Sequence, residues 1–147
     1  MSPNLEEAWR SLRLADRDIR AFEVLNQNGS VHLSVVCFHA QQAVEKSLKA
    51  VLFARRIESR RTHSLTELAS LLQQHGVESP VADDYLLRLN PYAVTFRYDD
   101  VDIQLISRKE VADLVSSLRQ WAEDQVTTMA RVEEGSSSAE SDLSGMT

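Results

Sequence analysis

The chain has 147 residues, of which 43% are hydrophobic and 26% are charged, with a formal net charge of -6 at pH 7. A chain of this length folds most simply as one domain with its own core, and its single cysteine excludes an internal disulfide. The negative charge argues against indiscriminate binding to nucleic acid. With no signal-peptide pattern and no apolar run near the ~20 residues of a membrane span, the sequence predicts a soluble, cytoplasmic protein.

Helical periodicity predicts the first two elements. Residues 3–26 carry apolar side chains at spacings of three and four, and Gly29 follows as a stop signal. The same spacing runs through residues 30–56, where Ser30 is a candidate N-cap. The length of this second helix makes it the expected centre of the fold.

Two shorter helices are predicted next. Thr62 or Ser64 is the candidate N-cap of the third helix, Ser64 with Glu67 as a capping box, and leucines on one face follow. Gly76 ends this helix. A fourth helix follows, and Pro91 interrupts or kinks it.

The last helix begins at Ser107, which forms a second capping-box signature with Glu110. Beyond residue 134 the sequence is small and polar, which predicts a disordered tail. No repeat and no strand-like alternation is present. We therefore expect an all-α fold, an antiparallel bundle of about five helices over residues 1–134, with a disordered C-terminal tail at 135–147.

The second helix also carries polar side chains among positions that look buried: Gln41, Gln42, Glu45, Lys46 and Lys49. In one interpretation Glu45 and Lys49, at i and i+4, form a surface pair while Lys46 extends along the surface. In a second, Lys46 and Lys49 present cations to a phosphate or an acidic partner. In a third, Glu45 or Lys46 pairs with Arg97 or Asp99 in a network inside the bundle.

Three motifs together resemble one family, the HEPN domain, named for nucleotide binding in higher eukaryotes and prokaryotes. They are FHAQQAVEKSLKAVL at residues 38–52, HSLTEL at 63–68, and Pro91-Tyr92 followed by FRYDD at 96–100. The resemblance covers about residues 5–130. It implies a small helical bundle, often a homodimer, that acts as a toxin or regulatory subunit beside a minimal nucleotidyltransferase in a toxin–antitoxin pair.

The resemblance also implies contact with a nucleotide, an RNA or the protein partner. No cofactor is expected, and no metal, because His32 and His39 lack the i, i+4 ligand spacing and no Cys or carboxylate set completes a site. The residues expected to make that contact are those of the motifs: Gln42, Glu45, Lys46, Lys49, Arg97 and Asp99.

Some members of the family are metal-independent ribonucleases with an Arg, four to six residues, then a His, completed across a dimer. Cleavage by the 2′-hydroxyl needs a general acid or base near neutral pH and a fixed cation for the phosphate. Arg56 and His63, separated by six residues, match that spacing, and Arg97 has no His in range. The alternatives to a toxin or regulatory subunit are therefore an RNA endonuclease using Arg56 and His63, or a non-catalytic dimerisation module.

A basic run lies between the second and third helices. It contains four arginines, which can hold RNA phosphates or form an ordinary solvated loop: Arg55, Arg56, Arg60 and Arg61. No aromatic residue is interleaved among them to stack on bases.

Overall fold

The computed structural model describes residues 1–93 and 106–144, and every regular element in these ranges is a helix. In chain order the elements are α1 (Pro3–Asn26), α2 (Leu33–Ala54), α3 (Leu65–Gln74), α4 (Asp83–Leu89), the 3-10 turn η1 (Asn90–Ala93) and α5 (Arg108–Ser144). The predicted all-α bundle of five helices is confirmed. Within the described ranges no helix combines the length and apolar content needed to cross a lipid bilayer.

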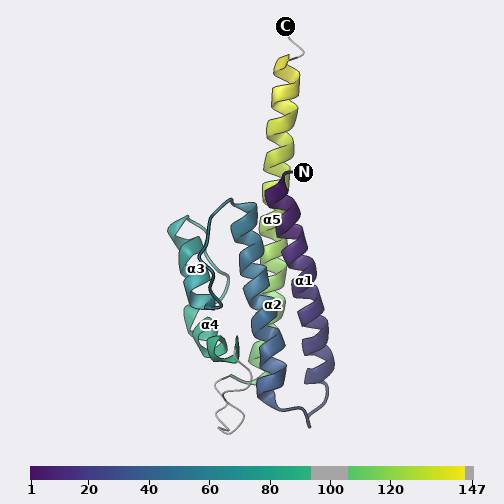
Figure 1. Ribbon diagram of the computed structural model, residues 1–147, viewed down its shortest axis with the longest axis vertical. Coiled ribbons are helices and arrows are strands. Elements are labelled where there is room, and N and C mark those ends of the chain that lie inside the picture. The colour runs from purple at the N-terminus through teal and green to yellow at the C-terminus, as the bar shows by residue number, and fades with distance from the viewer. Residues whose placement is uncertain (94–105, 145–147) are drawn as a thin grey trace.

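The second helix is the centre of the molecule, as its length predicts. α1 runs antiparallel to α2, α5 runs in the same direction as α2, and α3 and α4 lie on the other side of α2 (Figure 1). α1 and α2 approach closely enough for the Ser11 hydroxyl to donate a 2.7 Å hydrogen bond to the backbone carbonyl of Lys46. Small buried side chains permit this approach: Ala8 and Ala15 on α1, and Ala40, Ala43 and Ala50 on α2.

The N-terminus of α2 differs from its prediction. Helix α2 begins at Leu33, and its N-cap is His32, whose Nδ1 accepts from the Ser34 amide at 3.1 Å. Ser30 does not cap the helix, because its amide and hydroxyl both donate to the side-chain oxygen of Asn28. This local side-chain turn competes with helix formation and delays the start of α2.

Helices α2 and α3 end in the same Schellman motif. The amides of Arg56 and Ile57 donate back into the last turn of α2, at 3.1 Å and 2.9 Å, and those of Gly76 and Val77 do the same in α3. The motif needs a left-handed residue just past the helix, and Gly76 supplies it with φ 79°. In α2 that position is occupied by Arg56, with φ 58°. A residue with a Cβ is disfavoured there by about 1 to 2 kcal/mol.

The capping box of α5 is present in both directions. The Ser107 hydroxyl accepts from the Glu110 amide at 3.1 Å, and the Glu110 carboxylate accepts from the Ser107 amide at 3.2 Å. Hydrogen bonding of the Glu110 carboxylate to the side chain of Ser107, and then to its backbone amide, holds the pKa of Glu110 below its ordinary value. The box fixes the start of the helix at the base of the bundle.

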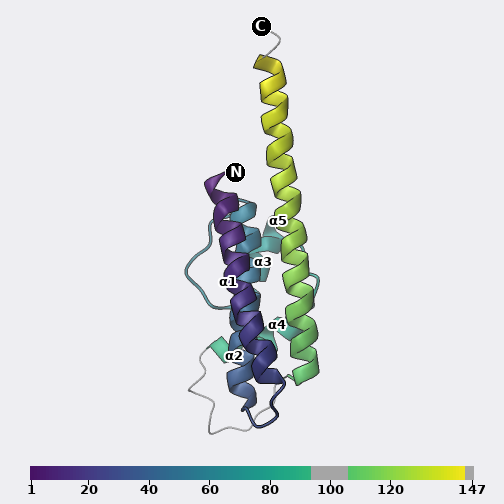
Figure 2. The ribbon, with the colours of Figure 1, turned by 90° about the vertical axis from the view of Figure 1, so that its right-hand side faces the viewer.

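Helix α5 extends to Ser144, past the end near residue 134 that the sequence predicts. Residues 135–144 project beyond the bundle, and none of the other described helices lies beside them (Figures 1 and 2). A helical segment without tertiary packing is marginal in water. The division into a bundle at 1–134 and a tail at 135–147 stays a prediction.

Candidate functional site

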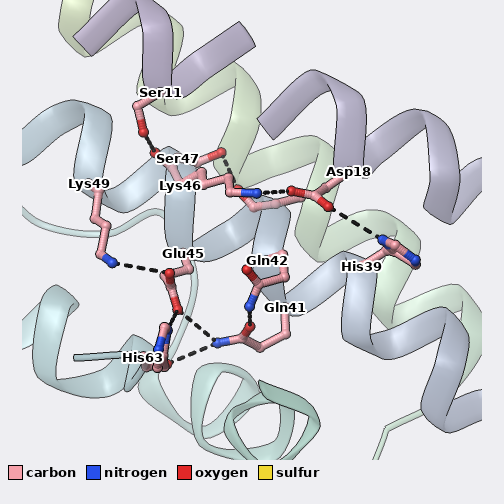
Figure 3. A network of polar contacts seen from close by, with 11 residues as sticks. Ser11, Asp18, His39, Gln41, Gln42, Glu45, Lys46, Ser47, Lys49 and His63 are labelled. Carbon is pink, nitrogen blue, oxygen red and sulfur yellow. Dashed lines mark hydrogen bonds and ion pairs between the residues drawn. The ribbon is translucent and has the colours of Figure 1, made fainter. Parts of the chain in front are cut away.

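Glu45 lies at the centre of a buried polar cluster. The residue is 4% exposed, and its carboxylate accepts hydrogen bonds on both oxygens (Figure 3). Oε1 lies 2.8 Å from Nδ1 of His63, and Oε2 lies 3.1 Å from Nζ of Lys49. The amide of Gln41 also points toward Oε1, at 3.5 Å. We call these four residues, Gln41, Glu45, Lys49 and His63, the Glu45 cluster.

Gln41 holds the backbone of the connection between α2 and α3. Its side chain is 0% exposed, and its Nε2 donates to the carbonyl of His63 at 2.9 Å. Its own Oε1 accepts from Nε2 of Gln42 at 2.7 Å. Because Gln41 and Glu45 are one turn apart on α2, they hold His63 by its main chain and by its ring.

The hydrogen bond to Glu45 sets which nitrogen of the His63 ring donates a proton. A carboxylate accepts hydrogen bonds, so Nδ1 donates the proton, and in the neutral ring Nε2 carries the lone pair. The side chain is 74% exposed, and Nε2 makes no hydrogen bond or ion pair with a described residue. A carboxylate–histidine pair with an open Nε2 is the arrangement of a general base or acid.

A second carboxylate on α1 holds a second lysine and a second histidine. Asp18 accepts from Nζ of Lys46 and lies 3.4 Å from Nδ1 of His39 (Figure 3). Lys46 is therefore engaged in joining α1 to α2. We call Asp18, His39 and Lys46 the Asp18 cluster.

The other predicted pairing partners, Arg97 and Asp99, lie outside the described residues. Among the described residues, Glu45 pairs with His63 and Lys49, and Lys46 pairs with Asp18. The interpretation of Glu45 and Lys49 as an i, i+4 pair is confirmed, although Glu45 is buried and not at the surface.

A cleft of about 670 Å³ opens at the C-terminal end of α2, and we call it the α2-end cleft. Its lining residues are Asn4, Lys49, Leu52, Phe53, Arg56, Ile57, Glu58, Ser59, Arg60 and Arg61. Four of these side chains are cationic, against one carboxylate. The cleft is thus a local concentration of positive charge on a chain whose net charge is negative.

Lys49 joins the α2-end cleft to the Glu45 cluster, because it lines the first and pairs with Glu45 in the second. Arg56 and His63, the pair predicted from spacing, accordingly belong to adjoining sites. No hydrogen bond or ion pair joins these two described residues, so their direct cooperation stays a prediction.

The four arginines of the basic run have separate roles. Arg55 turns to α5 and donates to the side chain of Gln125 at 2.8 Å, so it is structural. Arg60 pairs with Glu67 at 3.1 Å while lining the cleft. Neither Arg56 nor Arg61 has a hydrogen-bonded acid among the described residues, and both line the cleft.

Phe53 is the functional candidate that the sequence reasoning missed. Its side chain lines the α2-end cleft, and the residue is 40% exposed. Phe53 precedes the basic run, which itself contains no aromatic residue. The signal was the helical register, because Phe53 lies one turn after Lys49 on the same face of α2.

The described residues give little support to a cysteine nucleophile or to a metal site. Burial raises the pKa of the Cys37 thiol to about 12, which removes it as a nucleophile. No group of three or more His, Cys, Asp or Glu side chains within the described ranges is arranged to hold a metal ion.

Comparisons with known proteins agree on one family. A family model described as "HEPN domain" matches residues 8–125. The crystal structure of an archaeal HEPN homologue has a TM-score of 0.56 to this chain, with 21% sequence identity, over 81% of this chain and 97% of that one. At this identity the second match shows similarity of fold. A search of curated proteins finds no match.

Proposed function

Because the chain belongs to the HEPN domain family, we propose that it acts as a toxin or regulatory subunit beside a minimal nucleotidyltransferase and that it associates with RNA or a nucleotide. In this proposal the protein works in the cytoplasm as a homodimer. The observation that supports it best is the α2-end cleft, where Lys49 links a cationic surface to the exposed ring of His63.

The charge distribution supports association with a phosphate-bearing ligand. Phosphates are attracted by locally clustered Lys and Arg side chains even on a chain with a negative net charge. Of the residues proposed for this contact, Lys49 lines the cleft, whereas Glu45 and Gln42 act through the cluster that positions His63. Lys46 faces Asp18, so its contribution to binding is indirect.

The partnership predicts a mixed complex. The chain, co-expressed with a minimal nucleotidyltransferase encoded beside its gene, is expected to give a single species containing both proteins. Native mass spectrometry measures its mass and stoichiometry directly. Separate masses for the two proteins at micromolar concentration would contradict the partnership, while a mass of twice the chain alone would support the homodimer.

The geometry of His63 favours a second candidate, a metal-independent ribonuclease. Nε2 of His63 would take the proton from an RNA 2′-hydroxyl as the 2′-oxygen bonds to the adjoining phosphorus and the bond from phosphorus to the 5′-oxygen breaks. Glu45 would stabilise the imidazolium that forms, and the imidazolium would return the proton to the leaving 5′-oxygen. The guanidinium of Arg56, from the same chain or across the dimer, would neutralise the phosphate as negative charge develops.

His63→Ala is expected to slow cleavage of RNA by about 10² to 10⁴-fold, the usual contribution of a general acid or base. End-labelled RNA, incubated with each protein in excess EDTA and resolved on a gel, measures the rate. His39→Ala is the matched control, because His39 also pairs with a carboxylate but belongs to the Asp18 cluster. Equal cleavage by wild type and His63→Ala, or none by wild type, eliminates the ribonuclease.

A further inference from the structure

Arg56 occupies a backbone position that suits glycine. Its φ of 58° places it in the left-handed region, and Gly76 fills the equivalent position of the Schellman motif in α3. The same chain therefore uses glycine for this turn once and arginine once. A strained residue that persists at a cleft indicates that its side chain is needed there.

Among the described residues, no acid forms a hydrogen bond or an ion pair with the guanidinium of Arg56. Hydrogen bonding to Ser2 is the main cause that lowers the pKa of Glu133, and the charge of Arg56 is the smallest cause. No ion pair joins Arg56 to Glu133, whose carboxylate accepts from the Ser2 amide at 2.7 Å. In contrast, Lys49 and Arg60 in the same cleft pair with Glu45 and Glu67. Arg56 and Arg61 thus retain their charge for a ligand.

Phe53 gives the cleft a second kind of contact. It lies three positions before Arg56, lines the cleft and leaves 40% of its surface exposed. The side-chain amide of Asn4 donates to the backbone carbonyl of Phe53 at 3.4 Å, which joins α1 to this end of α2. An exposed aromatic ring beside free guanidinium groups is the composition of a platform on which a base stacks while its phosphate is bound.

We propose that the α2-end cleft binds single-stranded RNA, with a base stacked on Phe53 and the adjoining phosphate held by Arg56 and Arg61. This inference rests on the proposed association with RNA and names the form of RNA and the residues. A base inside a duplex has no free face for Phe53, so the cleft discriminates against double strands. The left-handed backbone of Arg56 then lowers the stability of the fold while placing a guanidinium group where it binds RNA.

Two variants separate the parts of the proposal. Arg56→Gly is expected to weaken binding of a single-stranded RNA decamer about tenfold and to raise the melting temperature, because glycine relieves the left-handed strain. Phe53→Leu keeps an apolar side chain and is expected to weaken the same binding about tenfold, with little effect on the weak binding of the corresponding duplex.

Fluorescence anisotropy at fixed salt measures the affinities, and differential scanning calorimetry measures the melting temperature. Arg10→Gln is the matched control, since it removes one exposed α1 charge that does not line the cleft. Its affinity for RNA is expected to stay within twofold of wild type.

The outcomes distinguish this inference from the proposed function. Wild-type binding that Arg56→Gly and Phe53→Leu leave unchanged overturns the cleft and leaves RNA association standing. Equal affinity for single and double strands, or a lower melting temperature for Arg56→Gly, also overturns the inference. Displacement of the RNA by an equal concentration of a poly-glutamate peptide assigns the cleft to an acidic protein instead. No RNA binding by wild type removes both proposals.

Discussion

Lys49→Met combined with His63→Ala is expected to lower the free energy of unfolding by about 3 to 5 kcal/mol. The two substitutions remove the Lys49 ammonium and the His63 ring, and leave a carboxylate that is 4% exposed with the Gln41 amide alone. A buried charge without a partner costs this much, whereas an exposed one costs little. Each single variant is expected to lose about 1 kcal/mol, because one partner remains and both partners are partly solvated.

Adding Glu45→Gln to the double variant provides the control. Glutamine keeps the shape and removes the charge, so most of the lost stability is expected to return. Urea unfolding followed by circular dichroism gives the free energies of unfolding of the wild type and the four variants. If the triple variant is as unstable as the double variant, packing and not the unpaired charge accounts for the loss.

Leu48→Ala is expected to cost about 2 to 5 kcal/mol. Leu48 is 0% exposed on α2, which α1, α3 and α5 surround, so its neighbours cannot collapse into the cavity. Leu87→Ala on α4 is the matched control, because Leu87 is 59% exposed and its truncation is expected to change stability by less than about 0.5 kcal/mol. Similar losses for the two variants in urea unfolding would contradict the central place of α2.

Much of the fold could be predicted because its signals are local. The apolar stripe of α1 predicts the observed Pro3–Asn26, and the caps Ser64 and Ser107 lie where the sequence places them. The predicted start of α2 was wrong because Ser30 hydrogen-bonds to the side chain of Asn28 and does not cap the helix. Hydrophobic periodicity gives no information on which of these two local structures is more stable. The extension of α5 beyond residue 134 has no periodic apolar signal to predict it.

The site was predictable only in part, because its contacts join distant segments. Glu45 and Lys49 are one helical turn apart, so their pairing follows from spacing. The contact between Glu45 and His63 depends on the path of the connection to α3, and that between Lys46 and Asp18 depends on the register of α1 against α2. The left-handed backbone of Arg56 carries no sequence signal, since glycine is the residue that marks such a turn.

The shared position of Lys49 makes the cleft and the histidine thermodynamically dependent on each other. An anion that draws Lys49 toward the cleft breaks its ion pair with Glu45, so that the His63 ring remains as the partner of Glu45. In return, a stronger or weaker hydrogen bond between His63 and Glu45 changes the strength of the ion pair between Glu45 and Lys49. Linkage makes such an effect reciprocal and equal in free energy. Occupancy of one end of α2 would therefore be communicated to the imidazole through a single side chain, without any movement of a helix.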